Sequence, residues 1–284
     1  MIKLLICTPS YFKNGKVAIS PKLATSLFAQ ETSCKWEWYI ATEDCVPNDN
    51  MMQVNQNMAF KLNKGRQITL EQGFDALWWL PDDHVLGAGV LEQMTRFIEL
   101  HKAGTSTHAI VSAPVRMRPS SMGMSHVLLM TYGKNNITDA DTIGVGRPAV
   151  TADPSQSNRW HKNLKWLIPF EVAGGGLPMI AREVLEKVKF RQENQLMTAH
   201  DIGADLRFFS DAYRLGYKTL IVPVQIGHID KGEEYWIDEA FYTELVDKNI
   251  LGEIIKEYVL DGKSLLDRED NQEEEQVGIS KVSE

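Results

Sequence analysis

The chain has 284 residues, of which 43% are hydrophobic, and a formal net charge of −8. This length is enough for one large domain with a buried core, and the acidic balance argues against binding nucleic acid through its phosphates. Three cysteines without metal-ligand spacing fit a reducing cytoplasm better than a disulfide scaffold. No apolar run approaches the ~20 residues of a transmembrane helix.

The negative charge is concentrated at the carboxyl end of the chain. Residues 267–284 carry seven acids and two bases, a net of −5, which leaves −3 for the rest. Such a polar, acidic segment cannot bury enough apolar surface to fold. We therefore expect one domain over residues 1–265 and a disordered tail over residues 266–284.

Strand and helix patterns alternate through the first 115 residues. Polar residues 48–57 give no clear prediction. The predicted strands are 2–8, 36–41, 75–80 and 109–115, and the predicted helices are 20–30, 65–73 and 90–101. This alternation favours an α/β fold, in which a mixed and mainly parallel sheet is flanked by helices.

Residues 117–165 are rich in Met, Ser, Gly, Asn and Asp, and only 126–132 resemble a strand. A loop as long as 139–165 is usually functional or disordered, and we expect it to act as a lid that orders with ligand. Regular patterns then return. We predict a strand leading into a helix over 179–188, a helix over 204–215 ending at Gly216, a strand over 219–224 and a helix over 241–259.

The most informative stretch runs from Asp75 to His84. Its apolar residues predict a buried central strand, and Pro81 should end that strand because proline cannot donate to a ladder. Asp82, Asp83 and His84 then lie at the carboxyl edge, where open α/β sheets bind ligands. The carboxylates suit Mg²⁺ or Mn²⁺. The alternative is a polar turn in which Asp82 or Asp83 caps the next helix.

Three further places look polar for a reason. Glu171 precedes the glycines 174–176, which permit close backbone approach. An acidic segment, 201–205, opens the helix at 204–215, and His228 follows the strand at 219–224. The glycines form neither a Walker loop nor a dinucleotide-binding GxGxxG motif.

The order of these motifs resembles a GT-A-fold glycosyltransferase of the large family 2-like group, over roughly residues 2–232. No single motif is specific, but six occur in the family's order. The similar segments are Leu4-Leu-Ile-Cys-Thr-Pro9, Gly65-Arg-Gln67, Leu80-Pro-Asp-Asp-His-Val85, Gly174-Gly-Gly-Leu-Pro-Met-Ile-Ala-Arg-Glu-Val-Leu185, Gly203-Ala-Asp-Leu-Arg-Phe208 and Val222-Pro-Val-Gln-Ile-Gly-His228.

Two positions depart from the family pattern. Pro81 stands where the family has the first Asp of its Asp-x-Asp motif, which leaves Asp83 as the aligned metal carboxylate. A shift of one residue would make Asp82 and His84 the outer pair instead. Ala204 replaces the Glu of a Glu-Asp pair and leaves Asp205 alone, although a shifted alignment would promote Asp201.

The resemblance implies a nucleotide-binding part over about residues 1–115 and an acceptor and loop part over about 116–265. It also implies transfer of a sugar from a nucleoside diphosphate sugar of UDP or GDP type to an acceptor hydroxyl, with inversion. Mn²⁺ or Mg²⁺ would neutralise the leaving diphosphate, held by Asp83, Asp82 and His228. Asp205 would take the proton of the acceptor hydroxyl as general base.

Other residues are expected to bind the donor or the acceptor. The residues with this expected role are Thr8, Pro9, Glu43, Asp44, Arg66, Asp82, Glu171 and Gly175. Each has a structural alternative, such as a surface salt bridge for Arg66 or a helix-dipole acid for Asp205.

The sequence does not identify the acceptor, which we expect to be a glycan, a lipid-linked sugar or a modified nucleobase. Two other functions remain open. Pro81 and Ala204 favour a catalytically weak protein that binds nucleotide sugars. A nucleotidyltransferase also uses strand-end carboxylates and a metal, but the loop 9–15 lacks the basic, glycine-rich character typical of that class.

Overall fold

The computed structural model describes ten stretches of the chain. These are residues 1–13, 16–49, 51–117, 126–127, 129–130, 150–151, 170–172, 174–191, 204–222 and 224–236. The expected lid at 139–165, apart from 150–151, lies outside them, as do the helix expected at 241–259, the acidic tail and Asp201. These expectations stay predictions.

The centre of the fold is a seven-stranded sheet in the order β12-β15-β7-β14-β5-β1-β4. Its strands are β1 (Lys3–Pro9), β4 (Lys35–Ala41), β5 (Ala76–Trp79), β7 (Ile110–Ala113), β12 (Phe170–Val172), β14 (Leu177–Ala181) and β15 (Thr219–Ile221). β1 runs parallel to β4 and β5, and β15 runs parallel to β7. Because β14 is antiparallel to both β5 and β7, five strands point the same way. β12 is also reversed, and the predicted mixed, mainly parallel sheet is confirmed.

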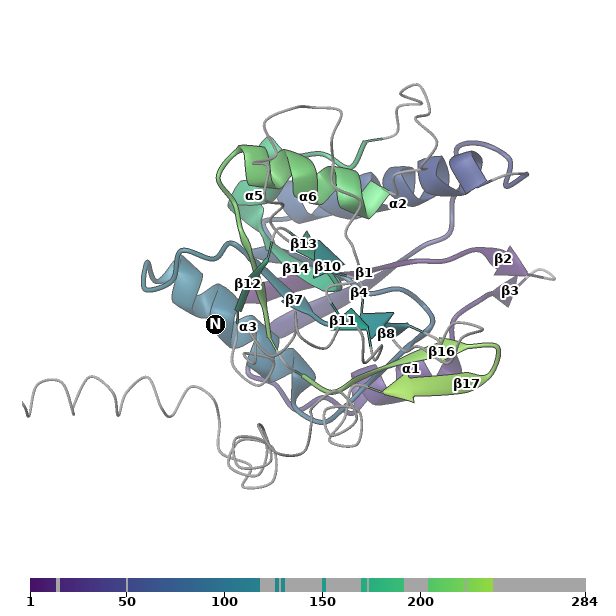
Figure 1. The fold of residues 1–284 in the computed structure, drawn as a ribbon, viewed down its shortest axis with the longest axis horizontal. Helices are drawn as coiled ribbons and strands as arrows, with labels where there is room; N and C mark the ends of the chain where they lie inside the picture. The colour runs from purple at the N-terminus through teal and green to yellow at the C-terminus, as the bar shows by residue number, and fades with distance from the viewer. Residues whose placement is uncertain are drawn as a thin grey trace, which may run out of the picture.

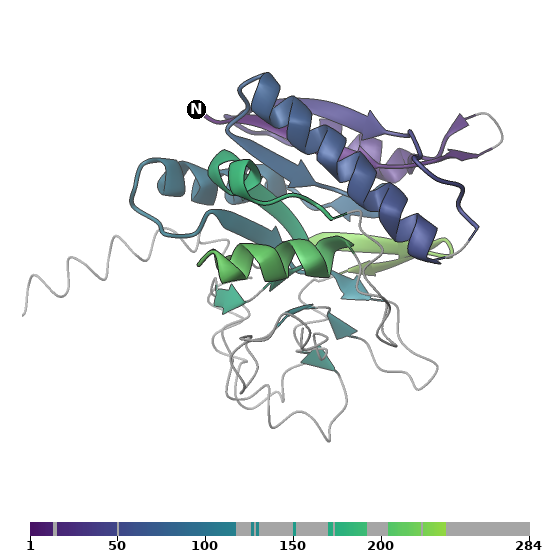
Figure 2. The same ribbon diagram turned by 90° about the horizontal axis from the view of Figure 1, so that it is seen from above.

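Helices cover both faces of this sheet (Figure 1). One layer holds α2 (Met51–Glu71), α5 (Arg182–Lys187) and α6 (Ala204–Arg214), and the other holds α1 (Pro21–Phe28) and α3 (Val90–Lys102). Figure 2 shows α2 and α6 over the same face. β1 and β5 are buried along nearly their whole length, as expected for strands covered on both sides.

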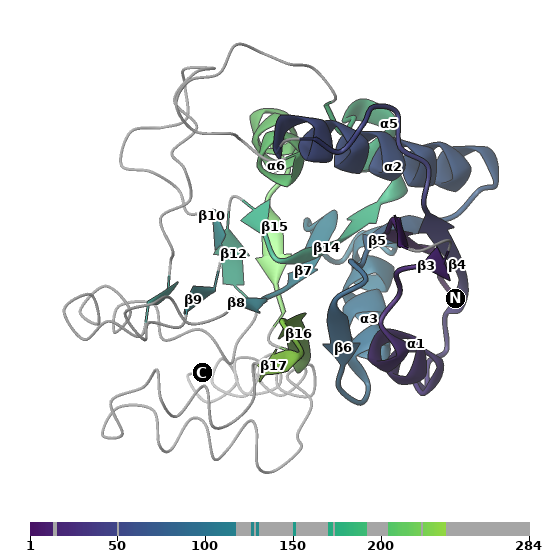
Figure 3. The ribbon, with the colours of Figure 1, turned by 90° about the vertical axis from the view of Figure 1, so that its right-hand side faces the viewer.

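Shorter strands lie outside the central sheet. They are β2 (Phe12–Lys13), β3 (Lys16–Val17), β6 (His84–Leu86), β8 (Arg116–Met117), β9 (His126–Val127), β10 (Leu129–Met130), β11 (Val150–Thr151), β13 (Gly174–Gly175), β16 (Ile226–Asp230) and β17 (Glu233–Trp236). β6, β16 and β17 form a small antiparallel sheet, which lies beside α1 (Figure 3). The β16–β17 turn has positive φ at Lys231 and Gly232, the geometry of a type I′ hairpin.

Two elements differ from the sequence prediction. α2 begins at Met51, well before the helix expected at 65–73. Its buried positions include Asn57, Lys61 and Thr69, so polar residues on the inner face hid the apolar periodicity.

The residues after Pro81 form a turn and then β6. The alternative of Asp82 or Asp83 as a helix cap is therefore wrong, because the residue that caps the following helix is Gly89.

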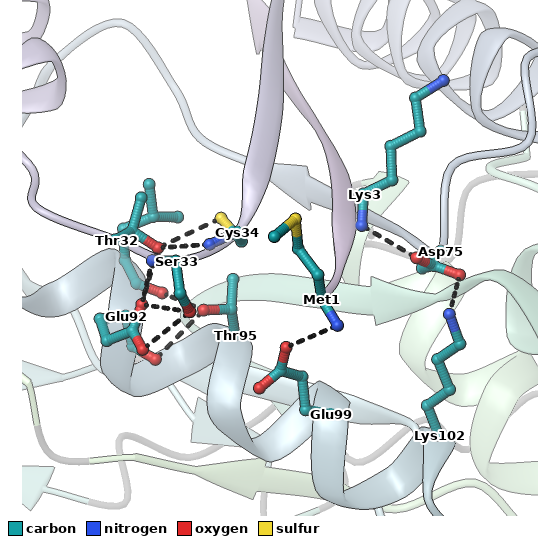
Figure 4. A network of polar contacts seen from close by, with 11 residues as sticks. Met1, Lys3, Thr32, Ser33, Cys34, Asp75, Glu92, Thr95, Glu99 and Lys102 are labelled. Atoms are coloured by element: carbon teal, nitrogen blue, oxygen red, sulfur yellow. Dashed lines mark hydrogen bonds and ion pairs between the residues drawn. The ribbon is translucent and has the colours of Figure 1, made fainter.

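Polar contacts fasten α3 to the amino ends of the strands (Figure 4). Asp75 accepts the backbone N–H of Lys3 at 2.8 Å and lies 2.7 Å from the ammonium of Lys102. Glu92 accepts the backbone N–H of Ser33 and the hydroxyl of Thr32, both at 2.8 Å. The backbone hydrogen bond from Ser33 is the largest influence on Glu92, and it outweighs burial to lower the pKa of that carboxyl.

We expect Glu92→Gln to lower the free energy of unfolding by ~1 kcal/mol at pH 7, because hydrogen bonds to the loop before β4 are weakened. Since the folded-state pKa of Glu92 is depressed, its contribution is present above the ordinary carboxyl pKa and is lost as pH falls through the folded value. The difference between wild type and variant should therefore shrink in urea titrations at acidic pH.

Glu31→Gln is the matched control, because Glu31 is an exposed carboxylate near the same loop. An equal loss of stability in both variants, or a Glu92→Gln difference that does not change with pH, would contradict this account of Glu92.

Candidate functional site

The candidate site lies where three parallel strands end together. Pro9 of β1 pairs with Ala41 of β4, and Cys7 of β1 pairs with Trp79 of β5. The segments that follow these strands must therefore leave the sheet at one edge. They bring together Ser10, the loop 42–49 and the turn at Pro81–Asp83, which are distant in sequence.

Asp83 lies between two imidazoles at this edge. One of its carboxylate oxygens, Oδ1, is 2.7 Å from Nδ1 of His84, and the other, Oδ2, is 3.3 Å from Nε2 of His228. His84 and His228 are direct partners across the antiparallel pair β6–β16, and their ring centroids are 5.2 Å apart. Cross-strand pairing therefore gathers the Asp83 cluster, defined as Asp83, His84 and His228.

Electrostatics keep Asp83 ionised. Burial by itself would raise the pKa of this carboxyl, but the contacts with His228 and His84 outweigh burial and hold the pKa well below its usual range. His84 is buried, and its Nε2 has no hydrogen-bond partner among the described residues. The cluster thus presents a charged carboxylate next to imidazole nitrogens, which is a donor set for a divalent cation.

Asp82 points to a different partner. The Ser10 hydroxyl lies 2.8 Å from Oδ2 of Asp82 and 2.8 Å from the carbonyl oxygen of Ala18. Burial raises the pKa of Asp82, with a further contribution from the charge of Asp83, while the hydrogen bond from Ser10 opposes the rise. The two adjacent carboxylates therefore differ in environment, although they are consecutive in the chain.

The loop after β4 is held by side chains that the sequence reasoning did not single out. Lys61 of α2 is buried, and its ammonium lies 2.6 Å from Oδ1 of Asp44. Asn57, four residues earlier on the same helix, accepts the backbone N–H groups of Cys45 and Val46. In the sequence, Asn57 and Lys61 stand at positions of α2 where the helical spacing calls for apolar residues. A polar residue at such a position is the feature that could have identified them.

Three other residues that were expected to bind the donor differ in their exposure to solvent. Thr8 is fully buried, and its hydroxyl accepts the indole N–H of Trp38 at 2.8 Å. Pro9 is also buried, whereas Glu43 is exposed beside Asp44. Thr8 therefore links β1 to β4 through its side chain, Pro9 is enclosed beside it, and Glu43 is accessible from solvent.

Arg66 contacts the backbone of α5 and of the residue that follows it. Its Nε donates to the carbonyl oxygens of Leu185 and Val188 at 2.5 and 3.1 Å. Arg66 thus ties α2 to α5 and the residue after it, and its expected contact with the donor stays a prediction. Burial lowers the pKa of its guanidinium.

The glycine run also lies at the carboxyl edge, because β14 starts there, with Leu177 opposite Ala113. A Cβ on Gly174 would come within 2.2 Å of the Phe209 ring, and one on Gly176 would come within 2.0 Å of the Ala113 carbonyl oxygen. Packing therefore explains two of the three glycines. Gly175, expected to contact the ligand, pairs with Leu129 and accepts a hydrogen bond from Ser112 at its carbonyl.

Two expected residues are placed by their backbone alone. Asp205 is the second residue of α6. Because β15, the next strand, runs parallel to β7, α6 runs back across the sheet and starts at the carboxyl edge. Glu171 is the middle residue of β12 and pairs with Leu220. The topology thus places Asp205, the expected base, at the same edge as Asp83.

The donor atoms can be tested for metal binding. Nε2 of His228 and Oδ2 of Asp83 are 3.3 Å apart, close enough for both to reach one cation. A carboxylate and an imidazole suit Mn²⁺, and one or two carboxylates with substrate phosphates suit Mg²⁺. Within the described stretches, no group of three or more His, Cys, Asp or Glu side chains is arranged to hold a metal ion. The fit is therefore that of a partial, two-donor site.

The fold and this edge define an α/β protein with a polar site at the carboxyl ends of its parallel strands. No protein-family model and no curated protein matches the chain. Among solved structures, the chain is similar to the crystal structure of A197 from STIV, with 15% identity and a TM-score of 0.45, over 82% of this chain and 87% of that chain. No helix in the described part of the chain is both long and apolar enough to cross a membrane.

The glycine run yields a test of packing at this edge. Gly176 combines a φ of +67° with the close approach of Ala113, whereas Gly216 has a φ of +87° and no described atom within 4 Å of the point that a Cβ would occupy. We expect Gly216→Ala to cost about 1–2 kcal/mol for the left-handed backbone. Gly176→Ala should cost a further ~1–3 kcal/mol for the clash.

Urea denaturation of both variants measures the difference. Equal losses of stability in the two variants would contradict this account, because they would mean that the Ala113 carbonyl moves aside for the added methyl group without a cost in free energy.

Proposed function

We propose that this chain is a glycosyltransferase of the GT-A-fold, family 2-like type, which moves a sugar from a nucleoside diphosphate sugar to an acceptor hydroxyl. The observation that carries the proposal is the Asp83 cluster, an ionised carboxylate between two imidazoles at the carboxyl edge of a mainly parallel sheet. Open α/β sheets bind their ligands at this edge, and a cation held there would neutralise the diphosphate.

The metal-binding role falls to Asp83 and His228, with Asp82 close by. A bound Mn²⁺ or Mg²⁺ would act as a Lewis acid toward the leaving diphosphate. His84 holds Oδ1 of Asp83 from the buried side, so the carboxylate keeps one orientation. Because Oδ2 of Asp83 lies near Nε2 of His228, this oxygen and this nitrogen would hold the cation.

The acceptor side of the proposal rests on α6 and β12. Asp205 lies in the first turn of α6 at the carboxyl edge, where it takes the proton from the acceptor hydroxyl, a weak nucleophile at neutral pH. Glu171 and Gly175 lie beyond it toward β12 and β13 and contact the sugar or the acceptor. An attack assisted in this way inverts the anomeric centre. The acceptor is a glycan, a lipid-linked sugar or a modified nucleobase.

The donor side rests on the loop after β4. Glu43 is exposed, and Asp44 is fixed beside it by Lys61, so this loop is the surface offered to the nucleoside of a UDP- or GDP-type donor. Thr8 and Pro9 support the same surface from β1. We place the reaction in the cytoplasm, in keeping with three unpaired cysteines.

A thermal-shift screen of UDP-, GDP-, CDP- and dTDP-sugars, with and without Mn²⁺, tests the donor. A ligand present at 100 times its dissociation constant stabilises the folded state by about 2.7 kcal/mol, which is readily measured. We expect one donor to stabilise the protein, and to do so more strongly with Mn²⁺. Product analysis then separates free nucleoside diphosphate, the glycosyltransferase product, from pyrophosphate. No shift with any donor would contradict the proposal.

Two substitutions separate metal binding from proton transfer. We expect Asp83→Asn to weaken Mn²⁺-dependent donor binding by at least about tenfold, because one partner of a charge pair is lost. Asp205→Asn should leave donor affinity unchanged and lower turnover by about 10²–10⁴-fold. Calorimetry measures the first quantity, and a transfer or donor-hydrolysis assay measures the second.

Glu31→Gln is the control, since Glu31 is an exposed carboxylate before β4 and outside the candidate site. Donor affinity equal to wild type in Asp83→Asn would remove the metal assignment. Full turnover in Asp205→Asn would remove the base.

A further inference from the structure

α2 carries a buried ammonium group to the donor side of the site. The side chain of Lys61 is 7% exposed. Its Nζ lies 2.6 Å from Oδ1 of Asp44 and donates to the carbonyl oxygen of Ser10 at 2.5 Å. These two oxygens belong to different segments, the loop after β4 and the residue after β1. One side chain therefore joins the ends of two neighbouring strands.

Asn57 fastens the same loop one helical turn earlier. It is 2% exposed, and its Oδ1 accepts the backbone N–H groups of Cys45 and Val46 at 2.8 and 3.0 Å. Its Nδ2 donates to the carbonyl oxygen of Val46 and to Oδ1 of Asn48, both at 2.8 Å. Asn48 in turn donates to Asp44 at 2.7 Å. The loop 44–48 is thus held from within α2 by Asn57 and Lys61.

The contacts continue from this loop to the end of β5. The backbone of Ser10 accepts the hydrogen bond from Lys61, and its hydroxyl contacts Asp82 at 2.8 Å. Ser10 is 3% exposed. A chain of direct polar contacts therefore runs from Asn48 through Asp44, Lys61 and Ser10 to Asp82. It links the loop expected to meet the nucleoside with the carboxylate next to Asp83.

The ion pair between Lys61 and Asp44 is not well explained by its contribution to the stability of the fold. Removing two charges from water costs free energy comparable to their attraction, and an apolar side chain of similar volume often serves the fold equally well. An ion pair with defined partners does, however, fix the groups that it joins in one relative arrangement. Fixing a binding loop before the ligand arrives avoids the entropy cost of ordering it on binding.

We propose that Lys61 is a positioning residue of the donor site, which fixes the loop 44–48 and Ser10 relative to each other. The proposal rests on the proposed function, because the ligand that benefits is the nucleoside diphosphate of the donor. Lys61 is too enclosed to be the first contact for that ligand, and it acts through Asp44 and through Ser10.

The test compares Lys61→Met with Lys64→Met. Methionine keeps the length of the lysine stem and removes the charge. Lys64 lies three residues further along α2, with its ammonium over the Phe60 ring. UDP and GDP with Mn²⁺ are the probes in calorimetry. For the nucleotide that wild type binds, we expect Lys61→Met to lose affinity about tenfold, which corresponds to about 1.4 kcal/mol, and Lys64→Met to match wild type.

Amide hydrogen exchange measures how firmly the loop 44–48 is held, and it requires no bound nucleotide. The amides of Cys45 and Val46 are bonded to Asn57, and they should exchange faster in Lys61→Met than in Lys64→Met because the loop is less firmly held. Lys61→Gln, which keeps a donor and removes the charge, should show the same changes, and it replaces Lys61→Met if that variant does not fold.

The outcomes separate this proposal from the proposed function. A folded Lys61 variant that binds UDP and GDP as wild type does would overturn the positioning role. If wild type binds neither nucleotide and no donor in the thermal-shift screen, the proposed function fails, and the exchange rates alone then decide the role of Lys61. The positioning role of Lys61 would also be overturned if the amide hydrogens of Cys45 and Val46 exchanged at the wild-type rate in both Lys61 variants.

Discussion

Parallel pairing of β1 with β4 and with β5 is the constraint on which the candidate site depends. Parallel strands end at the same edge, so the segments after Pro9, Ala41 and Trp79 have to meet there. The chain between these strands returns through helices on the two faces (Figure 1). Residues near positions 10, 44 and 82 become neighbours for this reason, although more than 30 positions separate each from the next along the chain.

Buried polar side chains then fix what the strands bring together. Lys61 and Asn57 hold the loop after β4, Ser10 holds Asp82, and His84 holds Asp83. Each of the four holding residues is at least nine-tenths buried, and buried polar groups are costly unless paired. Their contacts limit the movement of the carboxylates more tightly than surface contacts would. The edge is therefore preorganised around the loop after β4 and the turn after β5.

A second, smaller sheet completes the site from a distant part of the chain. β16 pairs with β6, which places His228 opposite His84 and beside Asp83. Gly227 permits Trp236 of β17 to pack closely on β16, since a Cβ there would lie 2.8 Å from the Trp236 ring. The pairing of β16 with β6 explains why Asp83 stays ionised, because it is the two imidazoles that counter the effect of burial on its pKa.

The sequence by itself determined the alternating α/β architecture and the buried strand that ends at Pro81. Apolar periodicity and proline chemistry are local properties, and β1, α1, β4, β5, α3 and α6 lie close to their predicted positions. It also indicated Asp82, Asp83 and His228 as polar residues at strand ends. The first half of α2 escaped prediction, since Asn57 and Lys61 occupy its inner face.

Only the tertiary structure decided which of these residues meet. Arg66 binds the carbonyls of Leu185 and Val188, while Lys61, five residues earlier on the same helix, reaches Asp44. Sequence spacing along a helix does not say which neighbouring segment each side chain contacts. The pairing of His84 with His228 likewise depends on strand register between residues 144 positions apart, which no local pattern encodes.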